Sequence, residues 1–124
     1  MTTEFDRAVQ AQSEAADSIE TAAIQLAVLE EQLSAAKDAL ALVEAQVRIS
    51  APLLGKNAED REAELLVRLR RSEEWQAASD EVVKTKALVE TQRAALERVR
   101  MKRQEWLQVM RFLTNLGIGP LNEL

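Results

Sequence analysis

The sequence of 124 residues contains no histidine and no cysteine. Without imidazole and thiol groups the chain lacks the commonest general base, a thiolate nucleophile, disulfides and Cys/His zinc sites. Most familiar enzyme mechanisms are therefore excluded. We expect a protein that is not an enzyme and has no metal, no cofactor and no small-molecule substrate.

Turn-forming and aromatic residues are also scarce: there are three Gly, two Pro, two Trp, two Phe and no Tyr. Tight turns depend on Gly, Pro, Asn and Asp, so a many-stranded sheet is excluded. With 47% hydrophobic and 30% charged residues, the composition is typical of long helices or coiled coils. At this length a multi-domain chain is not expected.

Long uncharged apolar runs are absent too. No stretch reaches the roughly 18 residues that a membrane-spanning helix needs, and the first residues lack a basic region followed by an apolar one. We therefore expect a cytoplasmic protein without a membrane partner.

A heptad pattern of apolar residues runs through residues 1–50, which contain neither Gly nor Pro. One line consists of Phe5, Ile19, Leu26, Leu33, Leu40 and Val47, with Gln12 as an exception, and a line of mostly small residues consists of Ala8, Ala15, Ala22, Leu29, Ala36 and Val43. Such a pattern predicts one helix whose seam a partner helix approaches closely.

The only clear interruption of this helical pattern is the corner over residues 51–57. Pro52 disfavours helix at the preceding residue, Gly55 offers a left-handed conformation, and Asn57 is a good N-cap. A second helix is expected over residues 58–115, followed by an apolar tail over 116–124, with Gly117 and Pro120 as stop signals.

The second helix has its own seam, although the pattern slips before Trp75. The seam is formed by Trp75, Val82, Val89, Leu96, Arg103 and Met110, with Ala78, Val99, Trp106 and Leu113 on a companion line. A slip of this kind indicates a change in supercoiling or in the partner helix.

Two long helices joined by a short corner predict an antiparallel hairpin. Folding about the corner would place Leu33 near Trp75 and Phe5 near Lys102 and Arg103. The chain beyond Arg103 would then extend past the first helix without an intrachain partner. We expect this overhang to be a protein interface, formed by Trp106, Leu107, Val109, Met110, Phe112, Leu113 and Leu116.

Each helix also carries apolar residues outside its seam. Ile24, Val28 and Leu42 do so in the first helix, and Leu88 and Val109 in the second. Because a helix in a two-helix hairpin buries a single stripe, these residues predict self-association into a four-helix or larger bundle.

Charge is distributed unevenly: residues 1–50 contain three basic and nine acidic residues, whereas the basic excess gathers near the end of the second helix. The basic residues there are Arg93, Arg98, Arg100, Lys102, Arg103 and Arg111. On one interpretation they are solvated or pair with acids of the first helix. On the other they bind nucleic-acid phosphates while Trp106 stacks on an unpaired base.

Acidic groups in the sequence do not predict a metal site. Residues 59–64 occupy the start of the second helix, where acids stabilise the helix dipole. Helical carboxylate sites project their ligands inward from facing helices, commonly with histidine among them. Gly55-Lys56 also fails as a phosphate-binding loop, because Ser50 and Asn57 replace the required Gly and Ser/Thr.

The corner carries one family resemblance. The segment Gly55-Lys56-Asn57-Ala58-Glu59-Asp60-Arg61, followed by an acidic, Leu-containing helix, resembles the corner of small helical proteins encoded by bacteriophages and prophages. This resemblance implies a viral early-region or DNA-metabolism setting and the host cytoplasm as location.

The sequence therefore favours an all-α helical hairpin that oligomerises and binds a protein partner, as an accessory or inhibitor. The alternative is an accessory protein that binds single-stranded nucleic acid through the basic residues of its second helix.

Overall fold

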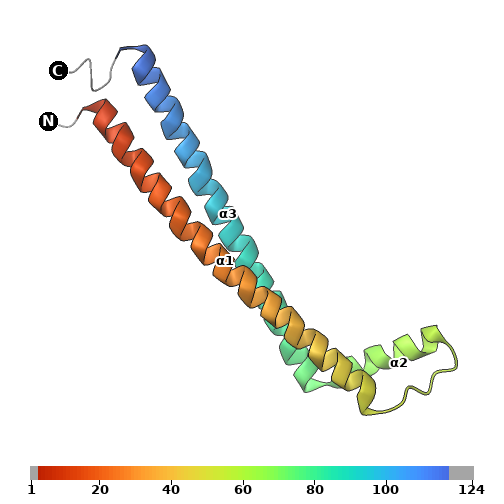
Figure 1. Ribbon diagram of the computed structural model, residues 1–124. Helices are drawn as coiled ribbons and strands as arrows, with labels where there is room; N and C mark the ends of the chain where they lie inside the picture. The colour runs from red at the N-terminus through yellow and green to blue at the C-terminus, as the bar shows by residue number, and fades with distance from the viewer. Residues whose placement is uncertain (1–2, 118–124) are drawn as a thin grey trace. The chain divides into compact units, whose positions relative to one another are not determined.

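The computed structural model describes residues 3–117. They form α1 (Glu4–Ser50), α2 (Ala58–Arg71) and α3 (Glu73–Asn115), and no strand occurs within this range (Figure 1). The expected all-α fold is confirmed. The expected tail falls outside the described residues from position 118 onward, Pro120 included.

α1 begins and ends where its sequence predicts. The Thr3 hydroxyl accepts a hydrogen bond from the Asp6 N–H at 3.0 Å, so Thr3 caps the first turn. Every residue of the two predicted heptad lines, Gln12 included, is buried or half-buried. Burial is deepest in the small-residue line, at Ala8, Ala15 and Ala22, because short side chains allow another helix to approach closely.

The chain groups into two compact units. One contains the described residues up to Ala27 and those from Thr91 onward, and the other is Val28–Glu90. α1 and α3 contribute to both.

In each unit α1 and α3 run antiparallel (Figure 1). In the first unit, Gln92 Nε2 donates to the Ala22 carbonyl and to Gln25 Oε1, each at 3.1 Å. In the second, Trp75 Nε1 donates to Glu44 Oε1 at 3.2 Å. The expected helical hairpin is thus confirmed.

The register of the hairpin differs from the expectation. Trp75 was expected near Leu33 but bonds Glu44, which is about three helical turns further along α1. In the first unit, Trp106 and Leu113 lie beside Glu4 and Arg7 rather than beyond the start of α1. The α3 residue that lies beside a given α1 residue is therefore later in the sequence than a corner at residues 51–57 alone would place it.

A break at Ser72 accounts for this shift. Ser72 adopts an extended conformation and ends α2, with its N–H bonded to the Leu69 carbonyl. Its hydroxyl accepts from the Trp75 N–H at 3.2 Å and so caps α3. The single helix expected over 58–115 is two helices, and the break coincides with the slip in the heptad pattern before Trp75.

The corner before α2 is held by side chains of α2 itself. Glu64 Oε2 accepts from the backbone N–H groups of Leu54 and Gly55 at 2.9 and 3.1 Å. Arg68 donates to the carbonyls of Ala51 and Pro52 at 2.7 and 2.9 Å and pairs with Glu64 at 3.0 Å. These bonds satisfy backbone groups that no helix satisfies.

Asn57 caps α2 as expected, since its side chain accepts from the Asp60 N–H at 2.8 Å. Gly55, however, is not left-handed: Gly117 is the only described residue with a positive φ, of 77°. Gly55 is needed for another reason, because a Cβ there would lie 2.6 Å from the Arg61 backbone nitrogen. The missing side chain lets the corner lie against the first turn of α2.

The seam of α3 largely follows the prediction. Its apolar members, which are Trp75, Ala78, Val82, Val89, Leu96, Val99, Trp106, Met110 and Leu113, are buried or half-buried. Arg103 is the exception and is exposed. Polar residues complete the companion line: Thr85 is buried and donates to Glu81 Oε1 at 3.4 Å, and Gln92 bonds α1.

Candidate interaction surfaces

The C-terminal apolar residues do not form an overhang. Leu113 is 5% exposed, Trp106 is half-buried, and both line a small hollow with Val109, Glu4 and Arg7. The expectation that this segment has no intrachain partner is therefore wrong. The cause is the break at Ser72, which lets the end of α3 lie beside the start of α1.

Part of this apolar set still faces outward. Phe112 is 63% exposed, and Leu107, Val109 and Leu116 are also exposed, whereas Met110 is half-buried. We call Phe112 and Leu116, which are four residues apart, the C-terminal apolar surface. Some residues of the interface predicted for this segment therefore pack within the chain, and the others are exposed to solvent.

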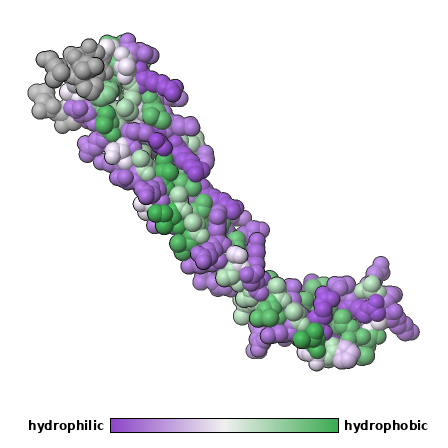
Figure 2. Space-filling model, viewed as in Figure 1, coloured by the Kyte–Doolittle hydropathy of each residue, from purple (hydrophilic) through white to green (hydrophobic). Residues whose placement is uncertain are grey.

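A second set of exposed apolar residues lies outside the seam. In α1 Val28, Leu42 and Ile49 are separated by multiples of seven residues, and Leu42 and Ile49 are 60% and 80% exposed. We call these three residues the outer line of α1. Figure 2 shows hydrophobic residues reaching the surface between hydrophilic ones on the face that it presents.

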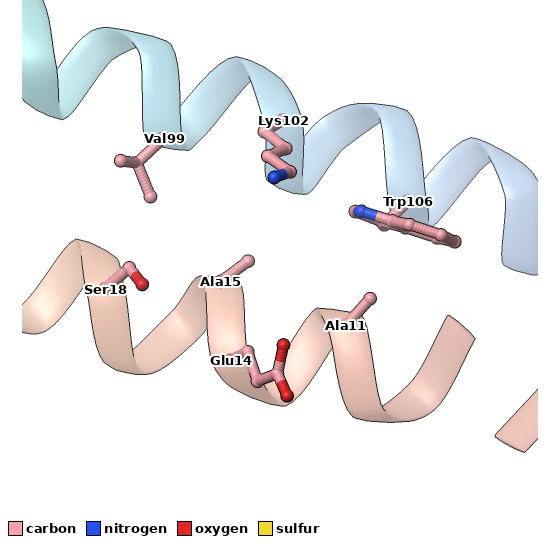
Figure 3. Close-up of a pocket in the computed structure, with 7 residues that line it drawn as sticks. All are labelled: Ala11, Glu14, Ala15, Ser18, Val99, Lys102 and Trp106. Atoms are coloured by element: carbon pink, nitrogen blue, oxygen red, sulfur yellow. The ribbon is translucent and has the colours of Figure 1, made fainter. Parts of the chain in front are cut away.

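One hollow of the first unit lies between α1 and α3, with a volume of about 300 Å³. Figure 3 shows Val99, Lys102 and Trp106 of α3 facing Ala11, Ala15 and Ser18 of α1, with Glu14 at its edge. The hollow has one ammonium and one carboxylate, so the opposite charges balance each other. This arrangement suits packing between two helices better than ligand recognition.

The six basic residues of α3 do not all share one face. Arg100 and Arg103 line a hollow with Gln104, Leu107 and Ile19, and Arg111 lines a second hollow with Gln104, Leu107 and Gln108. We call Arg100, Arg103 and Arg111 the arginine face. These three guanidinium groups are therefore brought together by the helix.

The other basic residues and Trp106 lie elsewhere. Lys102 and Trp106 share the hollow of Figure 3, which contains none of the arginine-face residues. Arg98 is two residues from Arg100 and therefore about 160° away around the helix. Arg93 is on the arginine side by its spacing and has an interaction of its own. Trp106 therefore lines a different hollow from Arg100 and Arg103.

Two sets of structural contacts were not predicted from the sequence. Glu64 and Arg68 hold the corner, yet in sequence they read as an ordinary i, i+4 ion pair on a helix surface. Gln92 reads as a polar interruption of the companion line, whereas it joins α3 to α1. Ser72 did carry a local signal, since Ser followed by two acidic residues is a helix start.

Neither a metal centre nor a membrane span is found in the part of the chain that the structure describes. Over residues 3–117, no three acidic side chains gather as they would around a metal ion. No helix in this range combines the length and apolar character needed to cross a bilayer. Comparison with protein-family models, curated proteins and solved structures found no match for the chain.

Proposed function

We propose that this chain is a non-enzymatic coiled-coil protein that self-associates and binds a protein partner. The observation that carries the proposal is the outer line of α1, Val28, Leu42 and Ile49, which stays exposed although α1 already has a buried seam. Single exposed apolar residues are ordinary on soluble proteins. Apolar residues at heptad spacing are different, because another helix can cover them together.

The C-terminal apolar surface supports the proposal that the chain binds a protein partner. Phe112 and Leu116 are four residues apart, which places them on the same side of the chain, and they are 63% and 59% exposed. Apolar anchors on one side of a helix are what a hydrophobic groove recognises. We therefore propose this surface as the site for a protein partner, with the cytoplasm of a phage-infected host as the setting that the corner sequence implies.

The solution mass of the full chain, measured by light scattering after size exclusion, tests self-association. We expect a dimer or a larger species. Leu42→Lys with Ile49→Lys should shift it toward the monomer, because two ammonium groups cannot be buried unpaired between helices. Gln32→Lys with Gln46→Ala changes exposed polar positions of α1 and is the control. A monomeric wild-type chain at every concentration would overturn the proposal.

A second candidate function is binding of single-stranded nucleic acid. It is favoured by one observation, that Arg100 and Arg103 line one hollow and Arg111 lines another that shares Gln104 and Leu107 with it. Binding of this kind should weaken steeply with salt and fall further in Arg100→Glu, because each phosphate contact releases counterions. Affinity for an oligonucleotide, measured by fluorescence anisotropy at two salt concentrations, tests this candidate.

A further inference from the structure

The arginine face has a counterpart of opposite charge in the same unit. Asp6, Asp17 and Glu20 are exposed on α1, beside the exposed Ile24. We call these three acids the acidic face. Their spacing places them within about 60° of one another around α1. The first unit therefore presents a cationic surface on one helix and an anionic surface on the other.

Neither face is neutralised within the chain. Among residues 3–117, the side chains of Arg100, Arg103, Arg111, Asp6, Asp17 and Glu20 form no ion pair. Opposite charges that remain unpaired on two helices of one molecule are available to a neighbouring molecule.

The two faces also match in spacing. Asp6 and Asp17 are separated by eleven residues, as are Arg100 and Arg111, which is about three helical turns in each case. The bond between Gln92 and Gln25 sets the antiparallel register. Continued along both helices, it brings Asp17 level with Arg100 and Asp6 level with Arg111.

This register has a consequence for a symmetric pair of chains. A two-fold axis parallel to the helices leaves the height of every residue unchanged. It therefore sets α3 of one copy antiparallel to α1 of the other, with Arg100 level with Asp17 and Arg111 level with Asp6. Each copy supplies both faces, so the contact is made twice and closes on itself.

We propose that the arginine face of α3 docks on the acidic face of α1 in a second copy of this chain, forming a two-fold dimer. This inference rests on the proposed self-association and names the surface that directs it. The apolar residues beside the charged groups, Leu107 on one face and Ile24 on the other, are covered in the same contact. The ion pairs select the antiparallel register, and apolar burial supplies affinity.

The charge of the chain favours this occupant over nucleic acid. The net charge is −5, and the acidic face stands in the same unit as the arginine face. A phosphate backbone approaching the arginine face would be repelled by these carboxylates. A second copy instead brings carboxylates to the arginines and arginines to the carboxylates.

Charge reversal on each face, followed by mixing, tests the proposal. Full chains carrying Arg100→Glu/Arg111→Glu or Asp6→Lys/Asp17→Lys are compared with wild type by sedimentation equilibrium. Each variant alone should show a dimer dissociation constant raised at least about tenfold, because like charges then face each other. An equimolar mixture of the two variants should restore the wild-type constant, since both contacts become attractive again.

The control is Arg98→Glu/Lys84→Glu, which makes the same change of charge at exposed positions away from the arginine face. It should leave the dissociation constant within about twofold of wild type. Circular dichroism checks that each variant remains helical. Should a reversed variant lose helicity, the neutral Arg100→Gln/Arg111→Gln chain takes its place and should still weaken the dimer.

Three outcomes would overturn the proposed docking surface, and they differ in whether they also overturn self-association. A dimer that ignores both reversed variants removes this docking surface but leaves self-association intact. A monomeric wild-type chain removes both proposals. Salt-sensitive binding of an oligonucleotide of about 20 nucleotides that is lost in Arg100→Glu/Arg111→Glu, with the dimer unchanged, assigns the arginine face to nucleic acid.

Discussion

Gly55 is the residue at which the size of a single side chain matters most. A Cβ there would stand 2.6 Å from the Arg61 nitrogen and 2.8 Å from the Asp60 carbonyl carbon. Both are backbone atoms of the first turn of α2, so they cannot move aside without distorting the helix start that Asn57 caps. The corner and the beginning of α2 are therefore one structural element.

Gly55→Ala is expected to lower the free energy of unfolding by about 1–3 kcal/mol, as overpacking usually does. Urea unfolding followed by circular dichroism at fixed protein concentration measures it. Lys56→Ala, at the exposed neighbouring position, is the control and should change stability little. An unchanged midpoint in Gly55→Ala would show that the corner can withdraw from α2.

Ser72 has a comparable role at the junction of α2 and α3. Its hydroxyl caps α3 and its N–H closes α2. Ser72→Ala should cost about 1 kcal/mol of stability, because the Trp75 N–H loses its acceptor. Ser34→Ala, at an exposed position inside α1, is a suitable comparison and should not destabilise the chain. Equal unfolding midpoints for the two variants would contradict the capping role.

At the scale of the helices, the seam is asymmetric. α1 contributes its deepest burial through small residues, Ala8, Ala15 and Ala22, whereas α3 contributes larger ones such as Val89 and Leu96. A line of small residues lets the other helix approach closely. Close packing of this kind tolerates little added volume.

Ala8→Leu should accordingly reduce stability by about 1–3 kcal/mol, since Ala8 is fully buried and the added atoms have no free space there. Ala39→Leu makes the same substitution at an exposed position of α1 and should be close to neutral. Thermal unfolding of the two variants at equal concentration compares them. If Ala39→Leu were the more damaging variant, the assignment of the buried side of α1 would be wrong.

At the scale of the whole molecule, much apolar surface stays exposed beside unpaired charge. The residues of the outer line of α1, the C-terminal apolar surface and the two charged faces are all exposed. A second copy covers apolar residues and pairs charges in the same step. Assembly and folding stability should therefore be linked.

This linkage predicts that the thermal midpoint depends on protein concentration. A tenfold increase in concentration should raise the midpoint of wild type, because mass action favours the associated, folded state. Circular dichroism melts over a concentration series measure the shift. The Leu42→Lys/Ile49→Lys chain should show a smaller dependence, and a wild-type midpoint that never moves would argue for a monomer.

Local information in the sequence determined the helices, their seams and most of their ends. Heptad spacing defines a buried stripe without reference to the rest of the molecule, and Thr3, Asn57 and Gly117 act on backbone groups a few residues away. Ile24, Val28 and Leu42 were identified as apolar residues outside the seam for the same reason. The difference in charge between residues 1–50 and 51–124 likewise follows from the numbers of acidic and basic residues in the sequence.

The tertiary structure alone decided the register, and with it the environment of each candidate residue. The register of α3 against α1 depends on how many residues separate the paired parts of the two helices. That number is set by the long-range bonds of Glu64 and Arg68 and by the break at Ser72. A heptad seam repeats, so sliding one helix by whole turns preserves its pattern and leaves no trace in the sequence. Trp106 and Leu113 were therefore identified as apolar from the sequence, but only the fold placed them against the start of α1.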